Sequence, residues 1–378
     1  MQQIEIEKKR LFDMQEPLIE WFEANKRSLP WREEPTPYHV WVSEIMLQQT
    51  RVEAVKDYYA RFLKQLPDLT DLAGAEEDVL LKLWEGLGYY NRIRNMQKAA
   101  KTVVEEYGGQ LPPDHDILLT LSGIGSYTAG AIASIAFQIP VPAVDGNVLR
   151  VITRICADET DIMKQSFKKS VETVLSEVIP PNNPGAFNQA LMELGALVCV
   201  PNGVPHCSEC PIAVFCKACM QGTMEDFPVK TPKKARVIEE KTVFLVRDGS
   251  FTALRKRGSQ GLLAGLYEFP NAAGYLTEKE AVAYLREQGF DSMRIEKLPE
   301  AKHIFTHKEW HMHGYLVRIA EQPEVTAKME MPRYGGKYRD EFVFATPEEM
   351  EDVYPVPSAF AAYRKLLNAY KLQPKSSR

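Results

Sequence analysis

The chain has 378 residues, a formal net charge of −5 and a hydrophobic fraction of 45%, which is typical of globular proteins with two ordinary domains. No stretch approaches the roughly 20 apolar residues of a membrane span, and the charged segment Met1–Arg10 lacks the apolar centre of a signal peptide. We therefore expect an intracellular, cytoplasmic protein with reduced cysteines rather than a membrane or secreted protein.

The charge also excludes a general basic coat for nucleic acid. Residues 1–224 carry 21 Lys and Arg against 29 Asp and Glu, whereas residues 225–378 carry 25 against 22. Any contact with nucleic acid must therefore come from helix N-termini and a few well-placed cations, such as Arg51, Arg92 and Arg150.

The first half of the chain has a helical pattern. From about residue 8 to residue 222, apolar residues recur every three or four positions, as in Val42, Ile45 and Met46. Residues 225–241 are polar, contain two prolines and lack this period, which indicates an interdomain linker. We expect an all-α domain over residues 1–224.

The second half has a mixed pattern of strand-like and helical runs. Residues 242–247 and 251–255 flank Asp248-Gly249 and predict a β-hairpin. Further strand-like and helical runs alternate after it, with strands expected at 302–306, 310–319 and 341–345 and helices at 278–288 and 358–369. We expect an α+β domain over residues 242–370.

Glu44 lies in the run Trp41-Val-Ser-Glu-Ile-Met-Leu-Gln-Gln-Thr-Arg51, where helical spacing places Glu44, Gln48 and Arg51 on one stripe. Such a stripe is ordinarily the solvated face of an amphipathic helix. Here the neighbouring residues are apolar almost all round, so we expect Glu44 to lie in or beside a pocket with a raised pKa.

A turn at Leu87-Gly88-Tyr89-Tyr90 follows a helix predicted over residues 76–86. The pattern is typical of a helix C-cap with core aromatics, and it also suits a wedge inserted between bases. The residues of the turn leave both interpretations open.

A helix-hairpin-helix is predicted around Leu121-Ser-Gly123-Ile-Gly125-Ser-Tyr127, because this run lies between two apolar helical segments. The second helix of such a hairpin presents free backbone N–H groups to an anion, most usefully a DNA phosphate.

Asp145 follows the hairpin, just before a further predicted helix. Alone it reads as an ordinary N-cap. Beside a phosphate clamp it would face an anchored sugar, where an oxocarbenium ion needs a counter-charge. Glu44 and Asp145 then suit two different tasks, because one carboxyl can protonate a leaving base while the other stays ionised.

Five of the six cysteines fall within residues 199–219. Four thiolates on one short loop can hold a metal centre, and the candidates are Cys199, Cys207, Cys210 and Cys216. A zinc clip that pairs Cys207 and Cys210 with Cys216 and Cys219 is the alternative, although its five-residue gap is shorter than the usual finger spacing of about 15. Spacing leaves zinc and iron–sulfur open, and Cys219 is spare in the second case.

Together these motifs resemble the helix-hairpin-helix DNA glycosylase superfamily. The runs 41–51, Glu85-Gly-Leu-Gly-Tyr-Tyr90 and Ala186-Phe-Asn-Gln189 closely match MutY-type adenine DNA glycosylases over about residues 10–370. The resemblance implies a DNA repair enzyme that hydrolytically removes adenine mispaired with 8-oxoguanine or guanine in duplex DNA and leaves an abasic site. It implies a monomer associated with the nucleoid.

The resemblance also implies roles for individual residues. Glu44 would protonate N7 of the flipped adenine, and Asp145 would stabilise or briefly capture the sugar cation, with support from Tyr127 and Asn147. The residues implied to line the adenine pocket are Trp31, Arg32, Leu47 and Gln189. Those implied to contact the strand with 8-oxoguanine are Gln49, Thr50, Leu87, Gly88 and Tyr89. Gly123 and Gly125 would bind a DNA phosphate.

Tyr127 separates this chain from the nearest alternative, an endonuclease III-like pyrimidine-damage glycosylase and lyase. Those proteins carry Lys at this position, and its amine forms the Schiff base that strand cleavage needs. The phenol of Tyr127 cannot form a Schiff base. We therefore expect a monofunctional glycosylase. A noncatalytic DNA-binding or iron–sulfur protein and a nucleotide pyrophosphohydrolase are more distant alternatives.

The cysteine loop departs from the family pattern at one place. The family has six residues between its first two ligands, whereas this chain has seven, Val200–His206, and the later gaps match. The resemblance implies a 4Fe-4S cluster on Cys199, Cys207, Cys210 and Cys216.

The second half resembles the MutT-like, Nudix-fold domain of these glycosylases, on Gly265-Leu-Tyr-Glu-Phe-Pro270 and Phe305-Thr306-His307. Thr306 stands where the family usually has Ser, and its hydroxyl would bond 8-oxoguanine. An Arg-Glu-x-x-Glu-Glu run for magnesium is missing after Glu268, so this domain is expected to recognise a base rather than hydrolyse a nucleotide.

Overall fold

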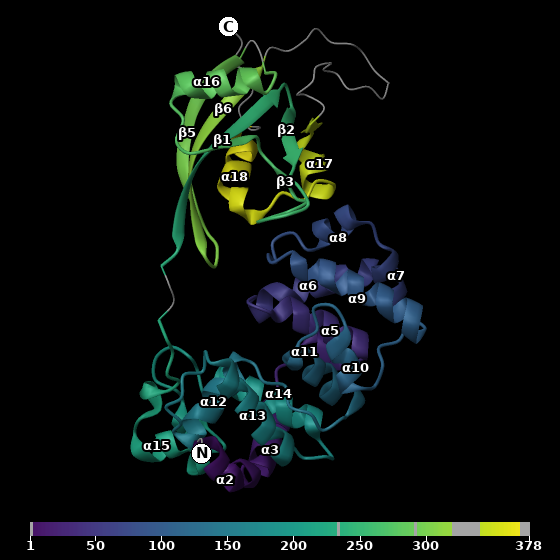
Figure 1. Ribbon diagram of the computed structural model, residues 1–378, viewed down its shortest axis with the longest axis vertical. Coiled ribbons are helices and arrows are strands. Elements are labelled where there is room, and N and C mark those ends of the chain that lie inside the picture. Colours follow the sequence, from purple (N-terminus) through teal and green to yellow (C-terminus); the bar gives the residue numbers. More distant parts are fainter. Residues whose placement is uncertain (1–2, 233–234, 291–292, 320–340, 371–378) are drawn as a thin grey trace. The chain divides into compact units, whose positions relative to one another are not determined.

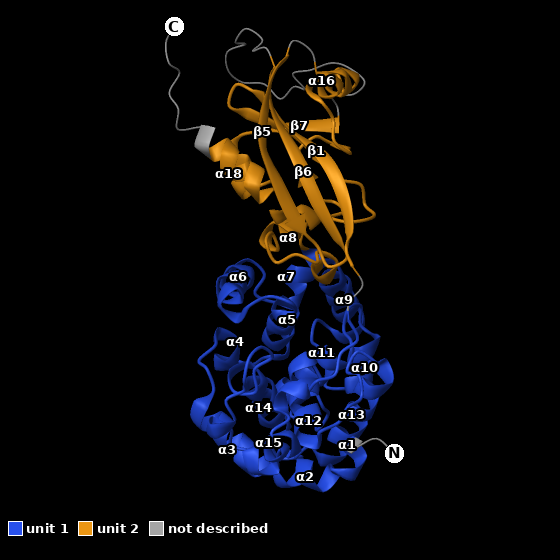
Figure 2. Cartoon of the chain, turned by 90° about the vertical axis from the view of Figure 1, so that its left-hand side faces the viewer, with its two compact units in different colours: residues 1–74, 94–233 blue, residues 75–93, 234–378 orange. Residues whose placement is uncertain are grey.

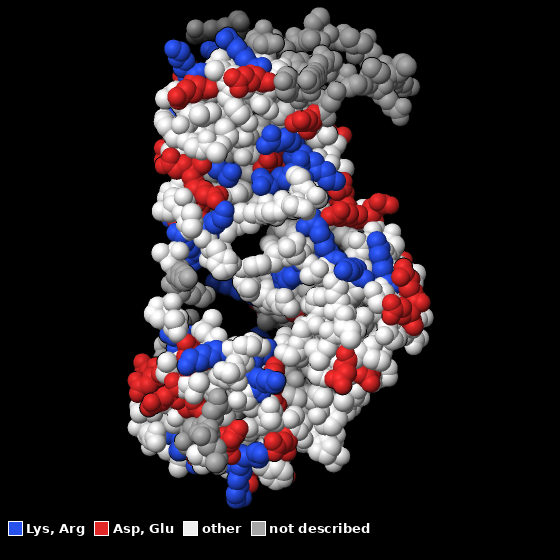
Figure 3. Space-filling model, viewed as in Figure 1, with Lys and Arg blue, Asp and Glu red and all other residues white. Residues whose placement is uncertain are grey.

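The computed structural model describes residues 3–232, 235–290, 293–319 and 341–370. The chain forms two compact units (Figure 2): unit 1 holds residues 1–74 and 94–233, and unit 2 holds residues 75–93 and 234–378. Within the described ranges, no helix is both long and apolar enough to cross a membrane. Acidic and basic side chains are interspersed over the face drawn in Figure 3.

Unit 1 is helical, as its periodicity predicts (Figure 1). Its α-helices are α1 (Gln3–Ile6), α2 (Lys8–Asp13), α3 (Gln15–Asn25), α4 (Pro30–Glu33), α5 (Pro37–Leu47), α6 (Val52–Gln65), α7 (Leu69–Gly74), most of α9 (Asn91–Tyr107), α10 (His115–Thr120), α11 (Ser126–Ala131), α12 (Gly146–Cys156), α13 (Gln165–Val178), α14 (Pro184–Leu197) and α15 (Lys217–Gln221). Single turns of other helix types are η1 (Ile132–Ala136), η2 (Cys207–Glu209), η3 (Ala213–Phe215) and η4 (Met224–Asp226).

The predicted hairpin is α10, a short turn and α11. Gly123 has a φ of +78°, and a side chain there would approach Cβ of Asn95 to 2.6 Å, so both backbone conformation and space require glycine. The turn ends at Gly125, where α11 begins one residue before Tyr127. The Gly-x-Gly turn therefore fixes the direction in which α11 carries its tyrosine.

Helix α12 runs through the core of unit 1, and nine of its eleven residues are buried. Its neighbours in the core come from α2, α3, α13 and α14, which bury residues such as Leu18, Phe167 and Phe187. The helix begins at Asp145, whose carboxylate accepts the Val148 N–H at 2.8 Å, and ends at Ala157 with a φ of +49°. A rigid, buried helix therefore holds Asp145 at its N-terminal end.

Unit 2 is an α+β domain built on one mixed sheet, with strand order β3-β2-β1-β6-β5, β4 paired to β1 and β7 paired to β2. The strands are β1 (Val237–Asp248), β2 (Phe251–Lys256), β3 (Tyr267–Glu268), β4 (Asn271–Ala273), β5 (Met293–Ile304), β6 (Lys308–Ile319) and β7 (Phe342–Ala345). Strands β1 and β6 run parallel, and the other pairs are antiparallel.

Both faces of the sheet are covered. Successive side chains of β1 point to opposite faces of the sheet and enter two different hydrophobic cores. Val243 and Leu245 pack with α17 (Pro347–Asp352) and α18 (Ala361–Tyr370). Phe244 and Val246 pack with α16 (Glu278–Glu287). Among the described residues, this unit also contains α8 (Glu77–Leu83), the first residues of α9 and η6 (Ser358–Phe360). The predicted hairpin is present as β1 and β2, with Gly249 and Ser250 at its turn.

The structure differs from the expected boundaries at three places. Strand β1 begins at Val237, inside the range expected to be linker, because its pairing with β6 extends to that residue. Residues 233–234 of that range lie outside the described residues. The helix expected over 76–86 is the shorter α8, and Gly86, with a φ of +99°, follows it in a conformation that ends a helix.

The third difference concerns residues 75–93, which we expected in the helical domain and which group with unit 2. Lys256 of β2 pairs with Asp78 at 2.7 Å, Lys82 donates to the Met350 carbonyl at 3.0 Å, and Arg364 of α18 pairs with Glu85. These partners lie at least 178 positions away in the chain. No local sequence pattern therefore predicts that residues 75–93 pack in unit 2.

Candidate active site

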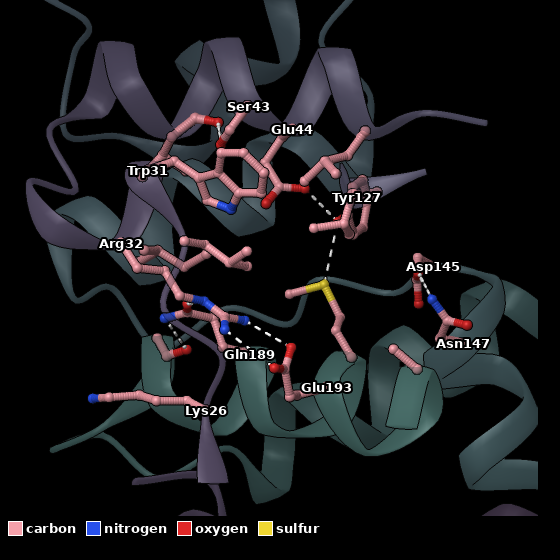
Figure 4. A pocket seen from close by; sticks show the side chains of 18 of the residues that line it. Lys26, Trp31, Arg32, Ser43, Glu44, Tyr127, Asp145, Asn147, Gln189 and Glu193 are labelled. Atoms are coloured by element: carbon pink, nitrogen blue, oxygen red, sulfur yellow. Dashed lines mark hydrogen bonds and ion pairs between the residues drawn. The ribbon is translucent and has the colours of Figure 1, made fainter. Parts of the chain in front are cut away.

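A cavity of about 910 Å³ in unit 1 is lined by residues of α3, α4, α5, α11, α12 and α14 (Figure 4). It brings together ten of the residues chosen from the sequence: Trp31, Arg32, Glu44, Leu47, Gln49, Thr50, Tyr127, Asp145, Asn147 and Gln189. Gly123 and Gly125 do not line it, and they lie in the turn that precedes α11.

Glu44 is buried in the wall of this cavity, with 7% of its surface exposed. It lies on α5, which Thr36 caps and Pro37 begins, and eight of the eleven residues of this helix are buried. The Tyr127 hydroxyl donates to its Oε2. Desolvation, reinforced by the nearby Asp145 charge, raises the pKa of Glu44 to about 7 despite this hydrogen bond. Near neutral pH the carboxyl can therefore hold a proton and give it up.

Asp145 has a different environment at the start of α12. One of its oxygens accepts the Val148 N–H at 2.8 Å, and the other accepts the Asn147 side-chain amide at 2.8 Å. Arg150 in turn holds Asn147 through its amide oxygen at 3.0 Å. Burial raises the pKa of Asp145, and these hydrogen bonds work against that rise. They stabilise the ionised form of the carboxylate that faces the cavity.

Close packing also fixes Asn147. A side chain at Gly195 of α14 would approach Cβ of Asn147 to 2.7 Å. The Arg150 guanidinium donates to the Gly195 carbonyl at 2.7 Å and to the Cys199 carbonyl at 2.9 Å. The amide that holds Asp145 is therefore positioned by α14 as well as by its own helix.

Glu193 was missed by the sequence analysis. This carboxylate has 1% of its side chain exposed and pairs with Arg27 at 2.8 Å and with Arg32 at 2.9 Å. Burial acts to raise its pKa, but the hydrogen bonds from the two arginines outweigh it and lower the pKa to about 2. Glu193 lies one helical turn after Gln189 on α14, and this spacing is the signal that could have identified it.

Arg32 and Gln189 form the wall opposite Glu44. Arg32 donates to the Gln189 side-chain oxygen at 3.1 Å, and Gln189 donates to the Gly185 carbonyl at 3.3 Å. Trp31 is 6% exposed and its ring lies edge-on to Tyr59 at 5.5 Å. A flat aromatic wall next to fixed amide and guanidinium groups suits a planar, nitrogen-rich base.

Comparisons with known proteins identify the family of the chain and of its two halves. Residues 42–181 match the model of the HhH-GPD superfamily base excision DNA repair protein, and residues 242–367 match the NUDIX domain. The chain is 35% identical to the adenine DNA glycosylase of Mus musculus over 82% of this chain and 71% of the relative. It is 31% identical to that of Buchnera aphidicola subsp. Acyrthosiphon pisum over 80% and 85%.

The chain belongs to the adenine DNA glycosylase family. It is a DNA glycosylase of base excision repair, with a helix-hairpin-helix domain and a Nudix-like domain. Among solved structures, a thermostable thymine-DNA glycosylase matches with a TM-score of 0.50 and 25% identity, over 56% of this chain and 98% of that one. That match shows the fold of the helical unit.

Four of the residues chosen for this glycosylase lie in unit 2. Tyr89 has a φ of +47° and 47% exposure, and its hydroxyl shares a hydrogen bond with the Thr306 hydroxyl. Leu87 is buried, and Arg92 donates to the Leu87 and Gly88 carbonyls at 3.0 and 3.1 Å. The turn therefore presents a tyrosine outward next to the Thr306 loop, which fits the wedge interpretation for Tyr89 and a core role for Leu87.

The cysteines of the glycosylase gather around a second cavity in unit 1, which all five thiols of residues 199–219 line. Arg154 donates to Cys199 Sγ at 3.2 Å, and the Cys216 thiol donates to the Arg154 carbonyl at 3.3 Å. In the described part of the chain, no three His, Cys, Asp or Glu side chains are grouped to hold a single metal ion. A four-iron cluster binds each thiolate at a different iron, so thiols spread around one cavity suit it better than zinc.

Proposed function

We propose that this glycosylase flips adenine out of A:8-oxoguanine and A:G mispairs in duplex DNA, hydrolyses its N-glycosidic bond and leaves an abasic site. The main support is the pairing of Glu44, with a pKa of about 7, and the hydrogen-bonded Asp145 in one cavity. Eversion is required because the glycosidic bond and N7 cannot be reached together inside a stacked duplex.

Glu44 is the proposed general acid. Its raised pKa allows it to be protonated near neutral pH, and protonation of adenine N7 makes the base a better leaving group. The Tyr127 hydroxyl orients the carboxyl by donating to Oε2, which leaves Oε1 to carry the proton toward the base. Arg32, Gln189 and Trp31 would hold the adenine ring in this position.

Asp145 is the proposed counter-charge. As the glycosidic bond breaks, positive charge develops on the sugar, and a preorganised carboxylate stabilises it most strongly in a site that excludes water. The Val148 N–H and the Asn147 amide hold the carboxylate ready, so little reorganisation is needed. Water then completes the hydrolysis.

We expect little strand cleavage, because position 127 is a phenol that hydrogen bonds to Glu44 and not an amine. Lys168 also lines the cavity, but it interacts with Ser126 at 3.2 Å and with Glu172 at 3.6 Å. An amine held by these partners is a poor nucleophile toward the sugar.

In unit 2, the exposed Tyr89 ring and the Thr306 hydroxyl are proposed to recognise the base opposite the adenine. We also propose that Cys199, Cys207, Cys210 and Cys216 would hold a 4Fe-4S cluster, which would cross-link the loop after α14 to α15 when bound. A nucleoid-associated monomer would be sufficient for this function.

Incubation with a duplex that contains one A:8-oxoguanine pair, followed by mild alkali, tests the proposal. We expect a nick in the adenine strand only after alkali, and none with a matched A:T duplex. Absence of the nick contradicts the proposal. Efficient borohydride trapping on damaged-pyrimidine DNA would instead indicate an endonuclease III-like glycosylase and lyase.

A further inference from the structure

The segment that leads into Asp145 has no regular secondary structure. It covers residues 139–144, between η1 and α12, and its two prolines, Pro140 and Pro142, have no N–H to donate. Ala143 and Val144 are each 1% exposed, so the end of the segment is buried. A buried backbone outside helices and strands needs side chains as hydrogen-bond partners.

The side-chain amide of Asn188 on α14 is such a partner. Its oxygen accepts the Ala143 N–H at 3.1 Å, and its nitrogen donates to the Val141 carbonyl at 2.9 Å. The same nitrogen donates to the Ser134 hydroxyl at 2.8 Å. With one acceptor and one donor, the amide pairs with the segment as the backbone of a neighbouring strand would. Asn188 is 1% exposed, so these hydrogen bonds are shielded from water.

Two glycines allow the elements around this amide to pack closely. A Cβ at Gly130 of α11 would lie 2.1 Å from the Pro142 carbonyl oxygen, and a Cβ at Gly185 of α14 would lie 2.7 Å from the Ser134 carbonyl oxygen. Both close approaches are to backbone atoms, which cannot rotate away as a side chain can. The segment is therefore packed against α11 and hydrogen-bonded to α14, and α14 is packed against η1.

We propose that Asn188 is a positioning residue for Asp145, because it fixes the backbone through which the chain enters α12. The Val148 N–H and the Asn147 amide orient the carboxylate within α12, whereas Asn188 holds the chain two residues before it. The inference rests on the proposed role of Asp145. Helix α14 also carries Gln189 in the wall of the cavity, so one helix places the base and the counter-charge together.

Asn188→Leu tests the proposal, because leucine has the same branched shape but no polar atom. The matched control is Ser134→Ala, which removes one partner of the Asn188 amide and leaves both contacts with the segment. Each substitution is made in the full chain, alone and together with Asp145→Asn. Single-turnover release of adenine from an A:8-oxoguanine duplex gives the rate at saturation and the enzyme concentration at half-saturation. Circular dichroism checks that each variant is folded.

Asn188→Leu alone should slow release at saturation by about 10- to 100-fold, since a small displacement of a catalytic group has an effect of this size. The concentration at half-saturation should change by less than about threefold, and Ser134→Ala should change neither value by more than about twofold. When position 145 is already asparagine, Asn188→Leu should slow release by less than about threefold, because the charge that it positions is gone.

Equal slowing by Asn188→Leu in the wild-type and Asp145→Asn backgrounds overturns the proposal, because a merely structural role affects both alike. A normal rate in Asn188→Leu overturns it as well. Neither result contradicts the proposed function, which fails instead when the wild-type chain releases no adenine.

A second variant and a measurement on the wild type remain decisive if Asn188→Leu does not fold. Asn188→Asp keeps the acceptor for Ala143 and loses the donor to Val141, and the same comparison of two backgrounds applies to it. In the wild type, the Ala143 amide should exchange with deuterium as slowly as the core amides of α12, because its acceptor is buried. Exchange as fast as in exposed loops contradicts the proposal.

Discussion

Glu44 and Glu193 line the same cavity, and both are buried, yet they are opposite in their chemistry. Two arginines hold Glu193 and lower its pKa to about 2, whereas Glu44 has a phenol as its hydrogen-bond partner and a pKa of about 7. The two side chains are both little exposed, Glu44 at 7% and Glu193 at 1%. Partner charge therefore separates a carboxylate that braces the wall from an acid that can transfer a proton.

Unit 2 contains a second buried carboxylate that pairs with two arginines. Glu268 of β3 is 3% exposed and pairs with Arg255 at 3.0 Å and with Arg257. Like Glu193, this carboxylate is an acceptor between two guanidinium groups, an arrangement in which it serves as a fixed anion. The comparison predicts that substitutions at Glu44 impair the chemistry without destabilising the fold, whereas substitutions at the paired carboxylates destabilise it.

The largest expected effect follows Glu44→Gln. The amide keeps the shape of the side chain but cannot donate a carboxyl proton, so single-turnover adenine release should fall by about 10²- to 10⁴-fold. Quench-flow rates on an A:8-oxoguanine duplex measure this change, with DNA affinity as the control for binding. A rate within a factor of a few of the wild type would end the assignment of Glu44 as the acid.

Asp145→Asn should slow adenine release by about 10²- to 10³-fold, because the amide removes the negative charge that stabilises the sugar cation. Asparagine still caps a helix, so α12 should remain intact and the free energy of unfolding should change by less than about 1 kcal/mol. Single-turnover rates and urea unfolding distinguish the two effects. A large loss of stability with a normal rate would make Asp145 only a cap.

Glu193→Gln should destabilise the protein by about 3 kcal/mol at neutral pH, because Arg27 and Arg32 lose their charged partner. The folded pKa of Glu193 lies below its ordinary value of 4.5, so its stabilisation is present above pH 4.5 and is lost as pH falls toward 2. Urea unfolding at neutral pH measures the change.

Glu44→Gln is the matched control, and its expected change in the free energy of unfolding has the opposite sign. The folded pKa of Glu44 lies above 4.5, so its ionisation costs stability as pH rises from 4.5 through about 7. At pH 8 the amide should therefore be more stable than the wild type, by up to about 3 kcal/mol. Destabilisation by both substitutions would show that the two carboxylates do not differ as proposed.

The pH profile gives the smallest effect. Glu44 is active as an acid only when protonated, so kcat/KM should be level below pH 7 and fall about tenfold for each pH unit above it. Glu193 should not contribute to this limb, since its pKa is about 2. Values of kcat/KM measured from pH 6 to pH 9 test the limb, and a flat profile contradicts a proton transfer from Glu44.

Much of the cavity could be predicted because its signals are local. The apolar neighbours of Glu44 on α5, the Gly123 turn before α11 and the capping position of Asp145 are all contained within a few residues. Strand β5 was predicted only from 302, although it begins at Met293, because its exposed charged residues weaken the alternating pattern.

The sequence by itself determined the change from a helical to an α+β half, the helix that carries Glu44, the turn before Tyr127 and the grouping of the cysteines. Only the tertiary structure decided that Arg27 and Arg32 reach Glu193 across 166 and 161 positions, that residues 75–93 belong with unit 2, and that the five thiols of residues 199–219 line one cavity. Periodicity, caps and turns depend on neighbours along the chain, whereas the partner of a buried charge depends on which helices pack together.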